Sequence, residues 1–296
     1  MTAVRAWRDA MGRTVRIPDG AQRIVSLVPS LTEVLCVYGR EAQVVGITDY
    51  CAEPASDVVH KRRVGGTKNP HLEAILALRP TLIFAVAEEN RYQDVAQLEA
   101  AGIPVYVFAP VTVRDGIDLL WRMADILDCQ PDVQQLLEAV EAAYAETQAL
   151  VATRTPVRVF CPIWKSPYMT INADTYIHDM LRVCGGNNIF AERQRRYPLA
   201  ADLGLQPEHR RARDTARDRR YPRVTLQEMA TLRPEVILLP DEPYVFSQAD
   251  MADFTPFTDV PAVAQGRIHL IDGKLLSWYG PRLGRSLRTL RRLLLP

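Results

Sequence analysis

The chain has 296 residues, of which 48% are hydrophobic and 24% charged, and its formal net charge is +1. These values are typical of a soluble globular protein that is long enough for two domains. The near-neutral charge gives no reason to expect nucleic acid or a membrane surface as a partner. The longest apolar run near residue 85 covers residues 82–87, far short of the roughly 20 residues that span a bilayer.

The first elements alternate between strand and helix. An apolar run at 23–28 predicts a strand, and Ser30 with Glu33 fits a capping box that opens a helix to about residue 39. Apolar segments at 44–48 and 103–108 predict further strands. This alternation indicates a parallel sheet that is covered by helices on both faces.

Two helices are predicted in the middle of the chain, over 113–128 and 132–152, with a break at Gln130-Pro131-Asp132. At 1.5 Å per residue the second helix is roughly 30 Å long. A helix of that length can serve as a rigid connection between two lobes.

The two halves of the chain contain an internal repeat. Residues 71–90 and 225–244 align at a constant offset of 154, which matches Arg79-Pro80 with Arg233-Pro234. Each copy predicts a short amphipathic helix, a break, an apolar strand and an acidic loop. A repeated unit of this size implies two similar lobes with a cleft between them. The predicted fold class is α/β, with two Rossmann-like lobes that have parallel sheets and are joined by one long helix, and the predicted domains are 1–128, 129–154 and 155–296.

The second half is predicted to contain strands at 157–163 and 267–272 and a helix at 174–183. Between them, residues 192–223 are irregular and rich in arginine. We interpret this segment as a solvated loop rather than as a nucleic-acid arm, because Asp214 and Asp218 interrupt its positive charge.

The candidate site lies at the carboxyl ends of the predicted strands, where ligands bind in open α/β sheets. Loops at these ends combine aromatic rings with fixed charges, which suits a large, flat, partly charged ligand. The candidate stacking rings are Tyr50, Trp164, Tyr168, Tyr221 and Trp278. The candidate polar or charged anchors are Lys68, Glu89, Asn90, Arg91, Asp241 and Arg282. Thr67 and Tyr244 complete the candidate ligand-binding set.

Signals for catalysis or for a metal site are weak. The sequence contains no G-x-S-x-G, H-E-x-x-H, P-loop or G-x-G-x-x-G pattern, and its five histidines have no ligand-like spacing. We therefore predict a binding protein with no catalytic residue and no metal ligand. The alternative is a cytoplasmic enzyme that processes a tetrapyrrole or metal chelate, with Glu88, Glu89 or Cys51 as its active group. A third interpretation is a two-lobed interaction module with an empty cleft.

Cysteine usage and the N-terminus suggest a cellular compartment. Five cysteines without a C-x-x-C pair predict reduced thiols, of which Cys51 is the candidate for a ligand contact. The first twenty residues contain no apolar segment of a secretory signal. If Met1 is the native start, this predicts a cytoplasmic protein, whereas a chain whose signal had been removed would be periplasmic or at the cell surface.

An ordered set of motifs resembles a known family. The segments are RIVSLVPSLTEVL, VVGITDYC, RVGGTKNPHLEAILALRPTLI, AAGIPVYVF, CGGNNIF and WYGPR. They resemble the cobalamin-binding and iron-chelate-binding receptors of ABC importers, in the helical-backbone metal receptor superfamily, over residues 12–295. The resemblance implies two Rossmann-like lobes joined by one long helix. It also implies that a corrinoid, haem or ferric siderophore is bound in the cleft without catalysis and without a covalent cofactor.

The resemblance also assigns positions. It implies ligand contacts at Tyr50, Thr67, Lys68, the stretch 164–168, Tyr221, Trp278 and Arg282. The family's cobalamin binders carry an aromatic ring near the position of Thr67, and this chain has none there. Receptors of this kind dock to a permease through one glutamate on each lobe; Glu73 fits the first place, and Gln227, followed by Glu228, is its counterpart in the repeat. The expected partners are a small-molecule metal chelate and an ABC permease, with the receptor a monomer; a cytoplasmic chelate carrier is the alternative.

Overall fold

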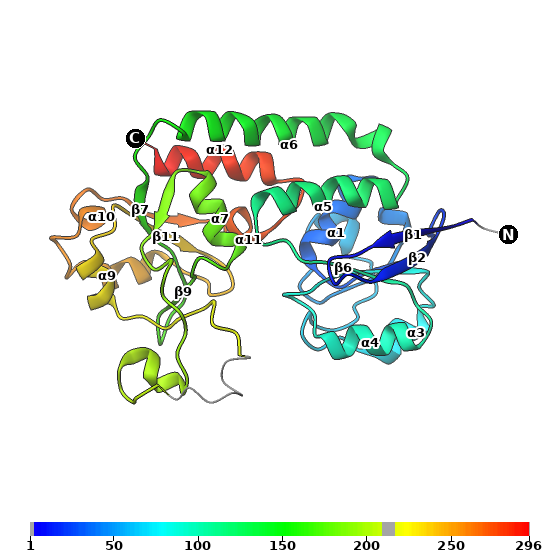
Figure 1. The fold of residues 1–296 in the computed structure, drawn as a ribbon, viewed down its shortest axis with the longest axis horizontal. Helices are drawn as coiled ribbons and strands as arrows, with labels where there is room; N and C mark the ends of the chain where they lie inside the picture. The colour runs from blue at the N-terminus through cyan, green and yellow to red at the C-terminus, as the bar shows by residue number, and fades with distance from the viewer. Residues whose placement is uncertain (1–2, 209–216, 296) are drawn as a thin grey trace. The chain divides into compact units, whose positions relative to one another are not determined.

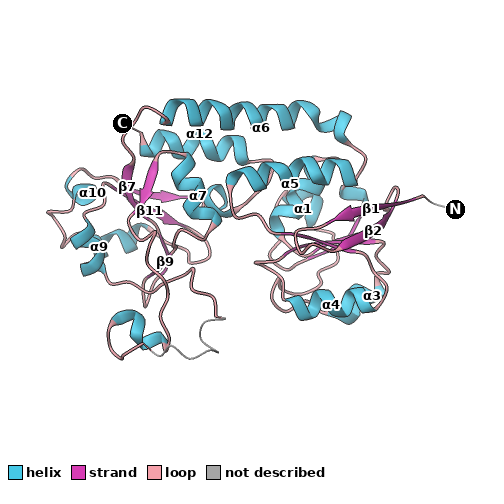
Figure 2. Ribbon diagram, viewed as in Figure 1, coloured by secondary structure: helices cyan, strands magenta, loops and turns pink. Residues whose placement is uncertain are grey.

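The structure is a computed structural model that describes residues 3–208 and 217–295 (Figures 1 and 2). Contacts between Cα atoms divide the chain into two compact units. Unit 1 consists of Met1–Pro110, Arg114–Glu141 and Tyr279–Leu283, and unit 2 consists of Val111–Val113, Ala142–Trp278 and Gly284–Pro296. Each unit contains a four-stranded parallel sheet.

The sheet of unit 1 has the strand order β4-β3-β5-β6. Its strands are β3 (Ile24–Ser26), β4 (Val44–Ile47), β5 (Leu82–Val86) and β6 (Val105–Phe108). Figure 1 shows α3 (Leu72–Ala77) and α4 (Tyr92–Ala100) on one side of this sheet and α1 (Pro29–Val37) and α5 (Val113–Ile126) on the other. Apolar side chains from neighbouring strands, including Val25, Ile83 and Val105, pack with Ile75 and Leu98 into one buried core.

The remaining elements of unit 1 are short. An antiparallel hairpin precedes the sheet, and short helices follow α1 and β4. These elements are β1 (Val4–Arg8), β2 (Thr14–Pro18), η1 (Glu41–Gln43) and α2 (Ala55–Val58). The hairpin is connected to β6, because the amide of Ala10 donates a hydrogen bond to the carbonyl of Val107.

The sheet of unit 2 has the order β10-β7-β11-β12. Its strands are β7 (Val157–Phe160), β10 (Gly186–Asn188), β11 (Val236–Pro240) and β12 (Ile268–Ile271). Its helices include α7 (Tyr176–Val183), η2 (Leu199–Leu203), α9 (Leu226–Leu232), η3 (Gln248–Phe254), α10 (Pro261–Ala264), α11 (Lys274–Ser277) and α12 (Leu283–Leu294). A separate antiparallel pair is formed by β8 (Pro162–Trp164) and β9 (Met169–Thr170). The single strand predicted at 157–163 is therefore two strands, which belong to different sheets.

One long helix, α6 (Gln130–Val151), contributes to both units. It has 22 residues, which gives a length of roughly 33 Å. The predicted break between the two helices is present but lies at residues 127–129. Pro131 lies in the first turn of α6, where its missing N–H removes no helical hydrogen bond. The predicted fold class, with two parallel sheets and one long helix, is confirmed.

The internal repeat is visible in the backbone. α3 with β5 and α9 with β11 are separated by the predicted break, and in both copies the arginine before the proline has a positive φ, 47° at Arg79 and 49° at Arg233. A left-handed residue ends a helix, and the following proline prevents its continuation. The Leu-Arg-Pro pattern therefore turns the chain in the same way in both units.

The capping box predicted at Ser30 and Glu33 is wrong. The N-cap of α1 is Val28, which makes no capping hydrogen bond with a side chain, and Pro29 occupies the first helical position. Glu33 instead binds Arg282. A capping box is present at α9, where Thr225 and Glu228 bond reciprocally.

Candidate ligand-binding site

Unit 2 contains a cluster of aromatic rings, which we call the aromatic platform: Trp164, Tyr168, Tyr244, Phe246 and Phe254. The ring centroids of Trp164 and Tyr244 are 5.7 Å apart, and those of Tyr244 and Phe246 are 4.7 Å apart. Tyr168 stacks on Phe246 and meets Phe254 edge-on. Phe246 and Phe254 are buried, whereas Trp164 is 43% exposed. The platform therefore leads from the core to a ring that a ligand can cover.

A charged network holds the loop that carries Trp164 and Tyr168. The Lys165 ammonium lies 2.7 Å from the Asp250 carboxylate and 2.8 Å from that of Asp253. The Tyr168 hydroxyl donates to Asp253 at 2.7 Å. The hydrogen bond from Lys165 lowers the pKa of Asp250 to about 2, and burial with the Asp253 bond raises the pKa of Tyr168. This network attaches the loop to η3 and orients the Tyr168 ring.

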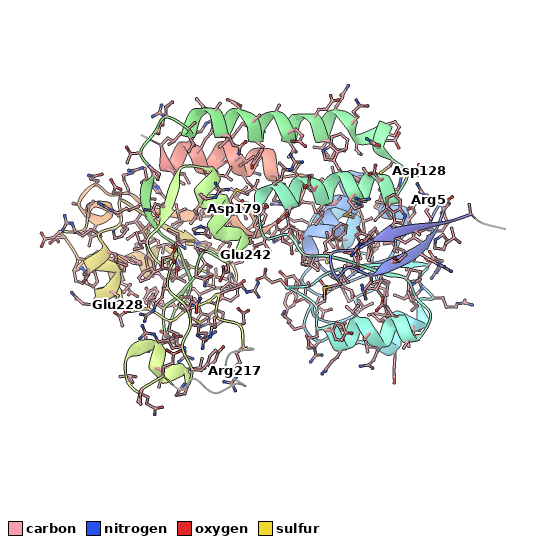
Figure 3. All side chains as sticks on the ribbon, viewed as in Figure 1. Arg5, Asp128, Asp179, Arg217, Glu228 and Glu242 are labelled. Atoms are coloured by element: carbon pink, nitrogen blue, oxygen red, sulfur yellow. The ribbon has the colours of Figure 1, made fainter. Side chains whose placement is uncertain are left out.

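Acidic residues at the carboxyl end of β11 bind the segment that leads to Trp278. Asp241 accepts a hydrogen bond of 2.7 Å from the Gly273 amide, and the Ser277 hydroxyl donates to Glu242 at 3.1 Å (Figure 3 labels Glu242). Burial raises the pKa of Glu242. The Trp278 ring is buried, with the Lys274 ammonium 5.9 Å from its centroid. Asp241 is therefore engaged in this loop, and ligand stacking by Trp278 stays a prediction.

In unit 1, Tyr50 presents an exposed ring beside a glycine loop. Its side chain is 65% exposed. A Cβ at Gly66 would lie 3.3 Å from Cε2 of Tyr50 and 2.4 Å from Oδ1 of Asn69, so a larger residue here would displace the Asn69 side chain. Thr67 is buried, and the Lys68 ammonium donates to the carbonyl of Glu88. The predicted residues Tyr50, Thr67 and Lys68 therefore lie in adjoining loops.

Asn90 joins three segments of unit 1. Its amide nitrogen donates to the carbonyls of Leu27, at 3.2 Å, and Thr67, at 3.0 Å, and its amide oxygen accepts from Val86 N at 2.9 Å. The side chain is buried. Asn90 thus holds the loops at the carboxyl end of the sheet in place, and its contact with a ligand stays a prediction.

Three more predicted residues have defined places. Glu89 follows β5 at the same end of the sheet. Arg91 pairs with Asp94 at 2.9 Å on the first turn of α4. In unit 2, the Tyr221 ring lies 5.4 Å from the guanidinium carbon of Arg220. Their roles in binding stay predictions.

Arg282 is buried and doubly paired within unit 1. Its Nε donates to Glu33 at 2.9 Å, and its Nη2 donates to Glu53 at 2.6 Å. Burial opposes the charge, but the two carboxylates outweigh it and raise the pKa of Arg282. The pairing was missed from the sequence, because Glu33 was assigned to a helix cap.

Cys51 is buried, and its contact with a ligand stays a prediction. Its sulfur lies 3.1 Å from the Thr32 hydroxyl and 3.2 Å from the Thr48 hydroxyl. Burial raises its pKa. A protonated and enclosed thiol does not act as a nucleophile.

The predicted docking residues lie at matching places on α3 and α9. Glu73 and Gln227 are exposed. The Glu228 carboxylate, labelled in Figure 3, accepts from the amide and hydroxyl of Thr225 and lies 3.4 Å from Arg193. Contact with a permease stays a prediction.

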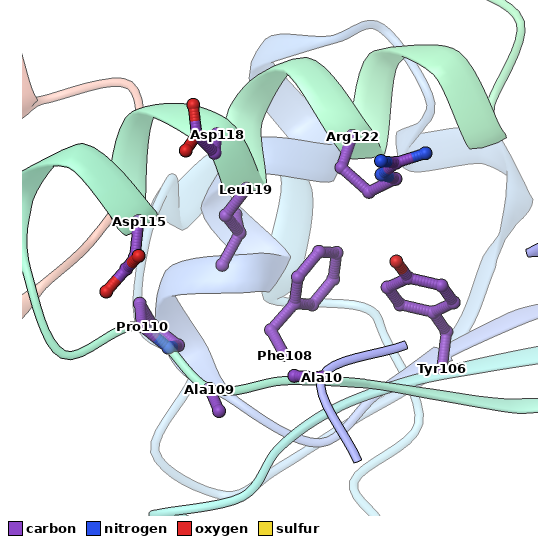
Figure 4. A pocket seen from close by; sticks show the side chains of 9 residues that line it. All are labelled: Ala10, Tyr106, Phe108, Ala109, Pro110, Asp115, Asp118, Leu119 and Arg122. Carbon is purple, nitrogen blue, oxygen red and sulfur yellow. The ribbon is translucent and has the colours of Figure 1, made fainter. Parts of the chain in front are cut away.

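A hollow of about 210 Å³ lies between β6 and α5 in unit 1 (Figure 4). It is lined by Ala10, Tyr106, Phe108, Ala109, Pro110, Asp115, Asp118, Leu119 and Arg122. None of the candidate ligand-binding residues lines it. Over the described ranges, no group of three His, Cys, Asp or Glu side chains could hold a metal ion.

A family model described as "Periplasmic binding protein" matches residues 24–275. The chain belongs to the periplasmic binding protein family. A vitamin B12-binding protein of Salmonella typhi is 28% identical over 192 residues, which cover 65% of this chain and 71% of the relative.

Two solved structures show the same fold. The vitamin B12-binding protein BtuF of Vibrio cholerae has a TM-score of 0.74 at 21% identity, covering 93% of this chain and 97% of that chain. The heme-binding protein RhuT of Roseiflexus sp. RS-1 has a TM-score of 0.71 at 22% identity, covering 93% and 98%.

Membership of this family bears on two predictions. The prediction of a non-catalytic binding protein is confirmed, because the relatives are substrate-binding proteins. The prediction of a cytoplasmic location is wrong, because the family and both solved relatives are periplasmic. Among the helices in the described part of the chain, none has the length and apolar character to cross a membrane.

Proposed function

We propose that this protein is the substrate-binding receptor of an ABC importer and that it binds a metal-containing macrocycle or chelate: a corrinoid, haem or a ferric siderophore. The main support for this proposal is the aromatic platform, in which the ring centroid of the exposed Trp164 lies 5.7 Å from that of Tyr244. Relatives that bind vitamin B12 or heme support this ligand class. Tyr50, which follows β4 in unit 1, stays a proposed ligand contact.

The free energy that one ring can supply sets the expected effect. Covering apolar area contributes about 25 cal/mol per Å², which is about 1.5–3 kcal/mol for a large aromatic side chain. A factor of ten in affinity corresponds to about 1.4 kcal/mol. Loss of one stacked ring should therefore weaken binding at least about tenfold.

The test is calorimetric titration of the purified protein with haemin, cyanocobalamin and a ferric siderophore. We expect one of them to bind with a Kd of about micromolar or below, and Trp164→Ala and Tyr244→Ala to weaken that binding about tenfold or more. Tyr144→Ala, a ring on α6 that accepts a hydrogen bond from Gln148, is the control and should bind normally. Absence of binding to all three probes would refute the proposal.

We further propose that the receptor is a monomer that docks to its permease through α3 and α9. The support is the placement of the exposed Glu73 and Gln227 at equivalent positions of the repeat. Glu73→Lys should reduce ligand-dependent stimulation of the permease ATPase while leaving the affinity for the ligand unchanged. Equal stimulation by this variant would remove Glu73 from the docking surface.

A further inference from the structure

Positive charge is concentrated in one segment of unit 2. Residues 192–223 contain ten arginines and five acidic residues, whereas the whole chain has a net charge of only +1. Four of these arginines, Arg193, Arg195, Arg219 and Arg223, have buried Nε–H groups that meet no acceptor among the described residues. We call them the arginine cluster.

The backbone brings the cluster together beside the aromatic platform. The Arg195 amide donates to the carbonyl of Arg219 at 2.9 Å, and Arg223 forms a β-bridge with Met169. Met169 begins β9 and directly follows Tyr168 of the platform.

A single buried carboxylate, Asp202, organises this region. Its two oxygens accept hydrogen bonds from the backbone amides of Arg196 and Arg223. The Asp202 side chain is fully buried, and Nε of Arg195 lies 3.7 Å from its carboxylate. The Asp202 carboxylate therefore accepts from main-chain donors, while its backbone carbonyl accepts from Nη2 of Arg193 at 2.7 Å.

The Nε–H groups of all four arginines are buried and have no hydrogen-bond acceptor among the described residues. Arg193 and Arg219 each approach a glutamate only at 3.4 Å, compared with 2.7 Å for Lys165 and Asp250. The side chains of Arg193, Arg195 and Arg219 are only 16–25% exposed. Because a buried donor without an acceptor is destabilising, this cluster needs acceptor atoms that the described residues do not supply.

Oxyanions supply such acceptors. A guanidinium group presents several N–H donors in a planar fork that matches a carboxylate or a phosphate. Ion pairs of 3.4–3.7 Å join Arg193 to Glu228, Arg195 to Asp202 and Arg219 to Glu208, whereas Arg223 has no such carboxylate among the described residues. An uncharged ligand would neither balance the guanidinium charge nor accept hydrogen bonds as strongly from the Nε–H groups.

We propose that the arginine cluster is an oxyanion site that takes a carboxylate or phosphate group of the ligand whose rings lie on the aromatic platform. This inference rests on the proposed function and narrows it to chelates with anionic side groups. The position of Arg223, bridged to the residue next to Tyr168, lets one ligand reach both features.

The first test compares haemin, which carries two carboxylates, with its dimethyl ester, which carries none. Wild type is expected to bind haemin at least tenfold more tightly than the ester. The double variant Arg195→Gln/Arg223→Gln should bind both probes equally. Arg182→Gln, an exposed arginine of α7 that is paired with Asp179, is the matched control and should keep the preference. Equal affinity of wild type for acid and ester would overturn the proposal.

A second test is independent of the macrocycle. Inorganic phosphate, compared with sodium chloride at equal ionic strength, should raise the Tm of wild type and of Arg182→Gln but not of the double variant. If the double variant does not fold, Arg195→Lys, which keeps the charge but lacks the Nε–H, replaces it and should lose the phosphate effect.

The outcomes separate the two proposals. Stabilisation by phosphate without haemin binding would retain the oxyanion site and remove haem as the ligand. Haemin binding that depends on Trp164 but not on its carboxylates would retain the proposed function and remove the oxyanion site. Stabilisation of wild type and double variant alike would mean that phosphate binds elsewhere and would count against the cluster.

Discussion

Arg282 and Glu33 are 249 residues apart in the sequence and form a buried two-point ion pair. Both side chains are about one-tenth exposed, and Glu53 adds a second carboxylate to the same guanidinium. The pair connects the short C-terminal part of unit 1, Tyr279–Leu283, to helix α1. The ion pair therefore holds residues 279–283 against α1 within unit 1.

Arg282→Met should destabilise the protein by about 3–5 kcal/mol, because it leaves the Glu33 carboxylate buried without its partner. The free energy of unfolding in urea measures this. Arg5→Met is the control: the Arg5–Asp19 pair is more than one-third exposed on both sides, and exposed pairs contribute about 0–1 kcal/mol. Adding Glu33→Gln to the Arg282 variant should recover part of the loss. A cost below about 1 kcal/mol for Arg282→Met would contradict a structural role for the pair.

Glu242→Gln should stabilise the protein at neutral pH. Burial raises the pKa of Glu242, so the folded state binds its proton more tightly than the unfolded state, and the ionised carboxylate is a cost above the folded pKa. Glutamine removes this cost and can still accept the bond from Ser277. The gain in Tm should shrink as the pH falls through the raised pKa and be absent below the ordinary glutamate value of 4.5.

The control for this prediction is Glu138→Gln, an exposed carboxylate on α6. Its Tm should follow that of wild type across the pH range. A Tm difference for Glu242→Gln that does not vary between pH 4 and pH 8 would refute the assignment.

Arg79 and Arg233 should tolerate glycine better than alanine. Both residues are left-handed, and a Cβ in that conformation costs about 1–2 kcal/mol. We expect Arg79→Gly to be about 1 kcal/mol more stable than Arg79→Ala, and the same at Arg233. At Gln135, an exposed position within α6, the order should be reversed by about 1 kcal/mol. Alanine and glycine variants of equal stability at both arginines would be inconsistent with this backbone.

The five cysteines should not react with an aromatic disulfide reagent in the native protein. All five are buried, and burial raises the pKa of Cys36 to about 11 and that of Cys161 to about 12. Because the thiolate is the reactive form, we expect full reaction only in denaturant. Val37→Cys, which places a thiol at an exposed position beside Cys36, should react within minutes. Rapid native modification of Cys51 would show that its loop opens.

The sequence by itself determined the parallel sheets, the long helix and the internal repeat, because each of these depends on local periodicity and on turn residues. Arg79-Pro80 and Arg233-Pro234 are an example: the Leu-Arg-Pro pattern predicted a break in both copies, and the structure adds that both arginines are left-handed. The loops at the strand ends were also predictable, since apolar strands end where polar and aromatic residues begin. The cellular compartment was not predicted correctly, because it was inferred from the first residues alone.

Only the tertiary structure decided which groups meet. Glu33 fits a helix cap by spacing, but a buried guanidinium 249 residues away is the stronger partner for its charge. Cys51 reads as a loop residue, yet Thr32 and Thr48 enclose it. The segment 192–223 reads as a solvated loop, but the Nε–H groups of Arg193, Arg195, Arg219 and Arg223 are buried in the structure. Partners distant in the sequence set the solvation and the charge balance of these side chains, and no local pattern records them.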